Sequence, residues 1–125
     1  SVSSDWATPS SILKLLDAEF HFTLDPCPLG IRPGDPYDGL ARSWSGERVF
    51  CNPPYGRSIG AWLRKAREPE LAVYLLPART DTKWFHEYAL VADEIRFLRG
   101  RLYFNDGGGR ATFPSMLVVY LPTRV

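Results

Sequence analysis

The sequence predicts an α/β fold, with a mostly parallel sheet of about five strands and an antiparallel C-terminal strand. Apolar, β-branched runs alternate along the chain with segments in which apolar residues recur every three or four positions. Such alternation is typical of an open α/β sheet that is largely parallel. The last two apolar runs, 94–98 and 116–121, have no helix-length segment between them, so we expect these strands to run antiparallel.

The first helix is predicted to begin at Thr8 and Pro9. A threonine cap followed by proline at the first helical position is a common helix start, and apolar residues at helical spacing continue to about residue 18. The aromatic and β-branched segment 20–24 then ends at Asp25-Pro26. We expect this segment to form the first strand of the sheet.

A long loop is predicted over 26–46, with one helical turn near 39–43. This segment holds four prolines and several glycines, which interrupt helices and strands. Loops of such length within a compact domain usually have a function.

The rest of the chain continues the strand–helix pattern. The run 71–76 is apolar throughout, as expected for a strand buried on both faces of a sheet. The predicted elements here are a strand at 47–51, a helix at 58–67, a strand at 71–76, a helix at 82–91, and the two final strands, separated by a glycine-rich turn at 107–109.

The composition indicates an ordered, globular chain, since 45% of the residues are hydrophobic and 23% are charged. The 125 residues fit a single domain spanning 1–125. The apolar runs are far shorter than the roughly 20 residues of a membrane helix, and the N-terminal residues do not resemble a secretory signal. We therefore expect a cytoplasmic protein without a membrane partner. The net charge of +1 by itself favours no class of partner.

No metal site is expected. The only cysteines and histidines are Cys27, Cys51, His21 and His86, and they lack the spacing of zinc ligands. A disulfide between the two cysteines is disfavoured, because intracellular chains usually keep their thiols reduced.

The most informative motif is Asn52-Pro53-Pro54-Tyr55, directly after the predicted strand 47–51. The Asn52 side-chain carbonyl and the Pro53 backbone carbonyl can accept both N–H bonds of a nucleobase amino group, which favours a nitrogen whose lone pair attacks a methyl donor. The prolines fix the backbone and donate no hydrogen bond. The Tyr55 ring offers a stacking face to a base taken out of its helix.

A structural alternative stays open, because Asn-Pro and Pro-Pro also mark turns. In that interpretation the motif ends a strand and Tyr55 simply packs. A second strand end, Asp25-Pro26-Cys27, also has unusual chemistry. Because ligands bind α/β sheets at the carboxyl ends of their strands, the two strand ends would face one crevice if their strands are neighbours.

The chain resembles the small phage-type DNA N6-adenine methyltransferases, which depend on S-adenosylmethionine and have the motif [DNS]-P-P-[YFW]. The matching segments are DWATP (5–9), LDPC (24–27), DGL with a following Trp (38–44), VFCNPPYG (49–56), LPARTDTKWFHEYA (76–89), IRFLRGRLYF (95–104) and PSMLVVY (114–120). The resemblance therefore covers nearly the whole chain. It implies a minimal, truncated Rossmann-like fold and site-specific methylation of adenine N6 in DNA after base flipping.

The resemblance also implies roles for single residues. Asn52, Pro53, Pro54 and Tyr55 would hold the target adenine. The residues implied for S-adenosylmethionine are Trp6, Thr8, Pro9, Asp25, Pro26, Cys27 and Asp38. Each has a structural alternative: Trp6 covers the helix, Asp25 caps a turn, or Asp38 starts an Asx-turn.

The sequence departs from the broader methyltransferase pattern after the first strand. The usual glycine-rich turn is absent, and 28–46 is too short for two further strand–helix units. We therefore expect five strands, equivalent to the usual first, fourth, fifth, sixth and seventh. The acidic residue that contacts the cofactor ribose is not identifiable, and Asp35 and Asp38 remain alternatives.

DNA contacts would come from the domain itself, since the chain has no room for a separate target-recognition domain. The implied DNA-binding residues are Arg57, Arg79, Arg99, Arg101 and Arg110. For Arg79 an ion pair with Asp81 is an equal alternative to a phosphate contact. This surface is small for one subunit to hold a DNA duplex. A homodimer, in which two subunits bind one duplex, is therefore an alternative to a monomer.

Two rival functions remain open at the level of sequence. The acceptor could be an RNA adenine or a protein glutamine amide, because Tyr55 stacks on either kind of flat group. Alternatively, the chain is a degenerate scaffold that binds nucleic acid without the cofactor, which the absent glycine-rich turn favours.

The expected location follows from the source of the chain. If a phage encodes the protein, its location is the host cytoplasm.

Overall fold

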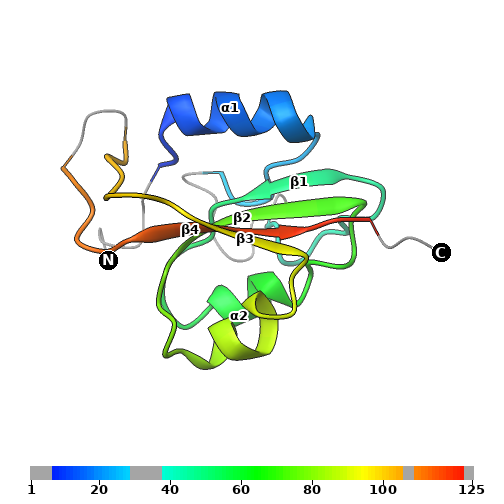
Figure 1. Cartoon of the computed structure of the whole chain (residues 1–125). Coiled ribbons are helices and arrows are strands. Elements are labelled where there is room, and N and C mark those ends of the chain that lie inside the picture. The colour runs from blue at the N-terminus through cyan, green and yellow to red at the C-terminus, as the bar shows by residue number, and fades with distance from the viewer. Residues whose placement is uncertain (1–6, 29–37, 106–108, 123–125) are drawn as a thin grey trace.

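A mixed sheet of four strands forms the middle layer of the protein, with one long helix on one face and two short helices on the other (Figure 1). The computed structural model describes residues 7–28, 38–105 and 109–122. Its elements are α1 (Ser10–Phe20), β1 (Arg48–Cys51), α2 (Ile59–Leu63), β2 (Leu71–Pro77), η2 (Phe85–Ala89), β3 (Glu94–Phe97) and β4 (Ser115–Tyr120). The α/β class is as predicted.

The strands lie in the order β1-β2-β4-β3. β1 and β2 pair in parallel, whereas β4 pairs antiparallel with both β2 and β3. The antiparallel C-terminal strand is thus confirmed. The prediction of five mostly parallel strands is wrong for the described sheet, which has four strands and one parallel pair. The reason is the position of β4: β3 points the same way as β1 and β2, but β4 separates it from them.

The start of α1 differs from the prediction. Pro9, and not Thr8, is the residue before the first helical turn, and its carbonyl accepts a hydrogen bond from Leu13 N–H at 3.1 Å. Among the residues that the structure describes, no side chain caps this end of the helix. The Thr8 hydroxyl is not available as a cap because it bonds another side chain, described below.

α1 also ends later than predicted: it continues to Phe20, the first residue of the expected strand 20–24. Leu16 and Phe20 are both buried and lie one turn apart, so continuing the helix places both against the sheet. His21 ends the helix in the left-handed region, with φ 54°. Within 20–24 the contact with the sheet is limited to its end: Leu24 forms a parallel bridge to Val49, and Thr23 N–H donates to the Arg48 carbonyl at 2.7 Å.

The two other predicted helices are shorter than expected. Of 58–67 only Ile59–Leu63 is helical, and turns continue to residue 67. Of 82–91, η2 forms a wide turn in which Leu90 N–H reaches back five residues to Phe85 O, at 3.0 Å. This turn is sufficient to bury both Phe85 and Ala89.

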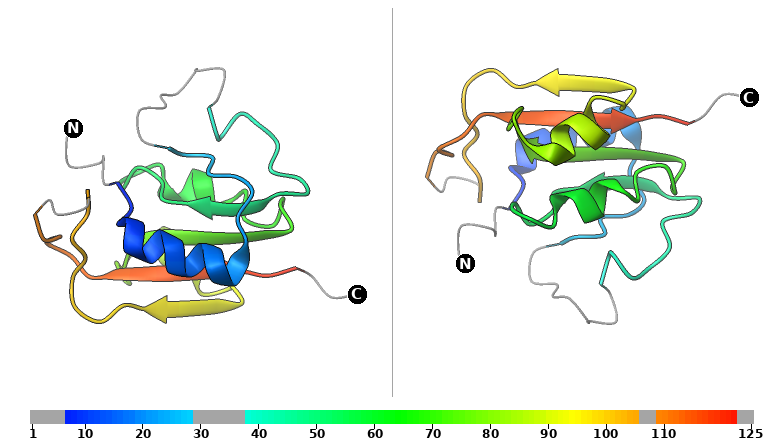
Figure 2. Two further views of the ribbon diagram at one scale, coloured as in Figure 1. Left: turned by 90° about the horizontal axis from the view of Figure 1, so that it is seen from above. Right: turned by 90° about the horizontal axis from the view of Figure 1, so that it is seen from below.

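β2 is buried along its whole length, as its apolar sequence predicts. Figure 2 shows why: α1 lies over one face of the sheet, and α2 and η2 lie over the other. The core accordingly forms two clusters. One joins Leu16 and Phe20 of α1 to Val73 and Leu75, and the other joins Ile59, Trp62 and Phe85 to Tyr74 and Leu76.

β1, β2 and β3 all end on the same side of the sheet, at the left of Figure 1. We call this side, where the carboxyl ends of these strands lie, the carboxyl edge. The same edge receives the segment between β3 and β4, which we call the arginine hairpin (98–105 and 109–113). An antiparallel bridge joins Tyr103 to Arg110 within it. The predicted turn at 107–109 falls mostly outside the described residues. In the described part of the chain, no helix has the length and apolar character needed to span a membrane.

Candidate active site

Asn52 follows β1 directly and lies half-buried at the carboxyl edge of the sheet. Its side-chain nitrogen Nδ2 donates a hydrogen bond to Thr8 Oγ1 at 3.0 Å. Pro53 is buried and Pro54 is half-buried, so the backbone after Asn52 is fixed both by proline geometry and by packing. Thr8, which the resemblance implies for the cofactor, thus lies against the predicted catalytic asparagine.

The segment that contains Thr8 is held by the arginine hairpin. Ala7 N–H donates to Asn105 Oδ1 at 2.9 Å, and Asn105 N–H donates to the Ala7 carbonyl at 3.0 Å. Asn105 has φ 58°, a left-handed conformation that asparagine tolerates better than most residues. Residues from the N-terminal segment, from the motif after β1 and from the hairpin after β3 therefore meet at this edge.

Tyr55 is half-buried in an aromatic cluster. Its ring meets Phe104 and Phe113 edge-on, with centroid distances of 6.4 and 5.6 Å, and its hydroxyl donates to the Leu75 carbonyl at 3.1 Å. Burial raises the pKa of Tyr55 above its ordinary value of 10.0, so the hydroxyl stays a protonated donor. Tyr55 therefore packs against its neighbours, as the structural alternative proposes.

Asp25 lies at the same edge, because the bridge of Leu24 to Val49 is parallel to β1. Its Oδ1 accepts a hydrogen bond from Cys27 N–H at 3.1 Å, which is the turn that the structural alternative anticipates. Desolvation by the surrounding protein raises the pKa of the Asp25 carboxyl, and the hydrogen bond from Cys27 opposes this shift. The segment that leads to Asp25 therefore lies beside β1, the strand that leads to Asn52.

Asp38 starts an Asx-turn, as its structural alternative predicts, because its Oδ1 accepts a hydrogen bond from Leu40 N–H at 3.0 Å. The turn brings Gly39 against Pro26: a β-carbon at position 39 would stand 1.9 Å from the Pro26 carbonyl oxygen. The loops that contain Asp25 and Asp38 therefore pack directly on each other.

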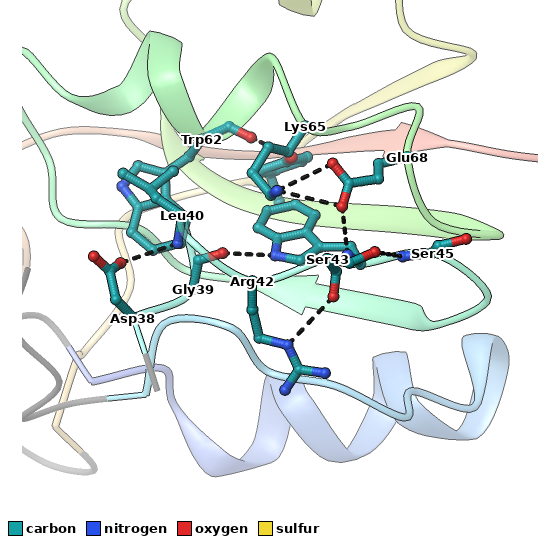
Figure 3. Close-up of polar contacts among 11 residues, drawn as sticks. Asp38, Gly39, Leu40, Arg42, Ser43, Ser45, Trp62, Lys65 and Glu68 are labelled. Atoms are coloured by element: carbon teal, nitrogen blue, oxygen red, sulfur yellow. Dashed lines mark hydrogen bonds and ion pairs between the residues drawn. The ribbon is translucent and has the colours of Figure 1, made fainter. Parts of the chain in front are cut away.

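Trp44 anchors the loop that contains Asp38. Its partners Gly39, Lys65 and Glu68 are labelled in Figure 3. Its indole Nε1–H donates to the Gly39 carbonyl at 2.8 Å, and its backbone N–H donates to the Glu68 carboxylate. Lys65 pairs with Glu68 at 3.0 Å and lies over the indole ring at 5.3 Å. The tryptophan that follows the DGL motif thus stabilises the loop by donating a hydrogen bond to the glycine of that motif.

A cavity of about 460 Å³ lies between α1 and the segment 22–25. Among the residues that the resemblance implies for the cofactor, Asp25 lines this cavity, and Thr8, Pro9, Pro26, Cys27 and Asp38 do not. Its lining combines apolar side chains with polar ones from both elements: Ser10, Leu13, Lys14, Asp17, Phe22, Thr23, Leu24, Asp25 and Phe50. Trp6 and Asp35 lie outside the described residues.

All five arginines predicted for DNA are exposed, and within the described chain none of them joins an ion pair. The Arg79 guanidinium lies 5.6 Å from the ring centroid of Phe113, and Arg110 lies 5.9 Å from that of Tyr103. The alternative ion pair between Arg79 and Asp81 is not formed. By contrast, ion pairs engage Arg42, Arg48, Arg67 and Arg96.

Sequence reasoning missed four residues of this site. Phe104 and Phe113 enclose Tyr55, Asn105 holds Ala7, and Gly39 lets the two loops touch. For Asn105 a signal existed, since asparagine before Asp-Gly is typical of a tight turn. Among the residues described, no three His, Cys, Asp or Glu side chains gather as a metal site requires.

Comparison with known protein families gave a match. A family model described as DNA N-6-adenine-methyltransferase (Dam) matches residues 1–115. Comparisons with curated proteins and with solved structures gave none. The matched range contains every residue of the edge described above and most of the chain. The chain therefore belongs to the DNA N-6-adenine-methyltransferase (Dam) family.

Proposed function

We propose that the protein transfers a methyl group from S-adenosylmethionine to N6 of a flipped adenine in DNA, at the carboxyl edge of the sheet. Within a chain of the Dam family, one observation carries this assignment to a site: the amide of Asn52, in its Asn-Pro-Pro-Tyr sequence, is fixed at this edge by its hydrogen bond to Thr8. The same edge also has the Asp25 loop, the aromatic cluster around Tyr55 and exposed arginines that join no ion pair among the described residues.

Asn52 would act on the acceptor amino group. Its carbonyl Oδ1, together with the Pro53 carbonyl, accepts the two N–H bonds of adenine N6 and draws the nitrogen lone pair out of conjugation. The prolines keep both acceptors in place without competing donors. The work of these groups is positioning and directed hydrogen bonding.

The residues at this edge fit the cofactor in chemical type. S-Adenosylmethionine would supply an electrophilic methyl group, and it presents amino and hydroxyl donors together with the flat apolar face of an adenine ring. The Asp25 and Asp38 loops supply carboxylate acceptors and are packed against each other through Gly39. The cavity beside Asp25 adds apolar surface and falls within the 300–1,000 Å³ typical of ligand sites.

DNA would meet the edge through its phosphates and the flipped base. The five exposed arginines are free of ion pairs within the described chain, so phosphate binding would not first require breaking one. The half-buried ring of Tyr55, steadied by Phe104 and Phe113, would stack on the flipped adenine. The common direction of β1, β2 and β3 and the parallel bridge at Leu24 support a shortened Rossmann-like sheet.

The test is nucleoside mass spectrometry on DNA and RNA from a methylation-deficient host that expresses the chain or its Asn52→Ala variant. We expect N6-methyladenine in the DNA of cells with the wild-type chain only. Methylation confined to RNA would assign a different acceptor. Wild-type levels from a folded Asn52→Ala protein would remove Asn52 from the mechanism, and a wild-type chain that modifies nothing would overturn the proposal.

A further inference from the structure

The two ends of an asparagine side chain have similar size but opposite hydrogen-bonding character. The carbonyl oxygen only accepts and the amide nitrogen only donates. An acceptor amino group brings N–H donors, so the proposed reaction needs Asn52 Oδ1 toward the substrate. If the amide rotated by half a turn, Nδ2 would face the substrate instead. The N–H groups of Asn52 and of the substrate amino group would then both be donors, and no hydrogen bond could form between them. The orientation of this amide therefore decides whether Asn52 functions.

Thr8 contacts the donor end of the amide. Asn52 Nδ2 donates to Thr8 Oγ1 at 3.0 Å, and both side chains are half-buried. Because Nδ2 and Oδ1 branch from one carbon, holding Nδ2 against Thr8 turns Oδ1 away from it. The hydroxyl also fixes the plane of the amide, which an asparagine without such a partner adopts over a broad range.

The backbone on both sides of Thr8 is fixed. Before it, Ala7 exchanges two hydrogen bonds with Asn105 of the arginine hairpin, at 2.9 and 3.0 Å. After it, Pro9 has φ −56° and its carbonyl accepts the first hydrogen bond of α1. The position of the Thr8 hydroxyl is thus set jointly by the helix and by the hairpin that contains Arg99, Arg101 and Arg110.

We infer that Thr8 is a positioning residue that holds the Asn52 amide with Nδ2 against the Thr8 hydroxyl and Oδ1 turned toward the acceptor, and that Asn105 holds Thr8 in place. This inference rests on the proposed function of Asn52. It gives Thr8 a role different from the cofactor contact that the resemblance implies. It also links the hairpin that would meet DNA to the amide that would meet the base, through Ala7 and Thr8.

The kinetic test compares Thr8→Val, Thr8→Ser and the wild type, with calorimetry of S-adenosylmethionine binding for each. Valine keeps the shape and removes the acceptor, so kcat should fall about tenfold, while cofactor affinity and KM for DNA stay within about twofold. Serine keeps the hydroxyl and should restore kcat. Thr80→Val, at an exposed threonine outside the arginine hairpin, is the matched control. Unchanged kcat in Thr8→Val, or weaker cofactor binding with unchanged kcat, would overturn the inference.

A second readout does not depend on activity. The side-chain amide signals of Asn52 in a ¹H–¹⁵N spectrum are assigned by their absence in Asn52→Ala. They should shift in Thr8→Val and stay in place in Thr8→Ser; signals that stay in place in both would overturn the inference. If the wild type transfers no methyl group and these signals still respond to Thr8→Val, the proposed function fails and the contact between Thr8 and Asn52 stands.

Asn105→Gly tests the outer link, and also serves if Thr8→Val does not fold. Glycine tolerates the φ of 58° and removes only the side-chain acceptor for Ala7 N–H. We expect kcat to fall severalfold and the Asn52 amide signals to move in the same direction as in Thr8→Val. Wild-type kcat together with unchanged signals would show that the hairpin does not position Thr8.

Discussion

Gly39 and Pro26 touch backbone to backbone: a β-carbon at position 39 would stand 1.9 Å from the Pro26 carbonyl oxygen and 2.9 Å from its Cβ. Neither partner atom belongs to a flexible side-chain end, so the contact cannot be relieved by a rotamer change. This crossing joins the loop after Leu24 to the loop that Trp44 anchors. It therefore fixes the distance between the Asp25 and Asp38 loops.

Gly39→Ala should destabilise the protein by about 1–3 kcal/mol or more, because the new methyl group forces the two loops apart. The same displacement should weaken S-adenosylmethionine binding. Urea unfolding and calorimetry measure the two effects. Gly109→Ala is the matched control, since a β-carbon there meets no atom of the described residues within 4 Å and the residue is exposed. Equal unfolding midpoints for the two variants would contradict the close contact at Gly39.

Tyr55→Phe and Tyr55→Ala separate the ring of Tyr55 from its hydroxyl. Phenylalanine keeps the ring and loses the hydrogen bond to Leu75, so we expect about 0.5–1.5 kcal/mol less stability and nearly normal turnover. Alanine also removes the stacking face, worth about 1–3 kcal/mol per base, so kcat/KM should fall roughly 5- to 150-fold. Steady-state kinetics below the melting temperature of each variant tests this. Equal damage in both variants would argue against stacking.

Arg79→Gln and Arg110→Gln should each weaken DNA binding similarly for all sequences and reduce the salt dependence. Each phosphate contact contributes about 1 to the slope of log K against log salt concentration. Fluorescence anisotropy with labelled duplex DNA across a salt series measures this slope. Arg67→Gln is the control, because Arg67 pairs with Asp93 at 2.8 Å, beyond the amino end of β3 and thus at the opposite edge. A slope that changes equally in all three variants would remove the arginine edge as the DNA site.

Glu68→Gln should remove part of the pH dependence of stability. The hydrogen bond from Trp44 N–H, aided by Lys65, lowers the pKa of Glu68 below its ordinary value of 4.5. The unfolded chain therefore binds a proton more readily than the folded one, so this contribution is full above pH 4.5 and is lost as the pH falls through the lowered pKa. Urea unfolding of wild type and variant between pH 7 and pH 3 should show that the difference in their free energies of unfolding becomes smaller as the pH falls below 4.5. A constant difference would contradict the role assigned to Glu68.

Local patterns in the sequence determined much of this protein. Periodicity predicted α1, and a continuous apolar run predicted the buried strand β2. The missing helix between the last two strands predicted their antiparallel pairing. The motif Asn52 to Tyr55 lies at a strand end for a local reason, since two prolines end any strand. These features depend on residues close in sequence, which is why a single sequence is sufficient to predict them.

Other features were decided only by tertiary structure, because they depend on residues distant in sequence. Thr8 satisfies the local rule for a helix cap, yet its hydroxyl bonds Asn52, 44 positions away. Likewise β4 lies between β2 and β3, where its apolar side chains are buried on both faces. The sequence alone thus determined which chemical groups the site contains. The packing of loops and strands decided which of them touch, because burial and hydrogen bonding across the sheet edge outweigh local preference.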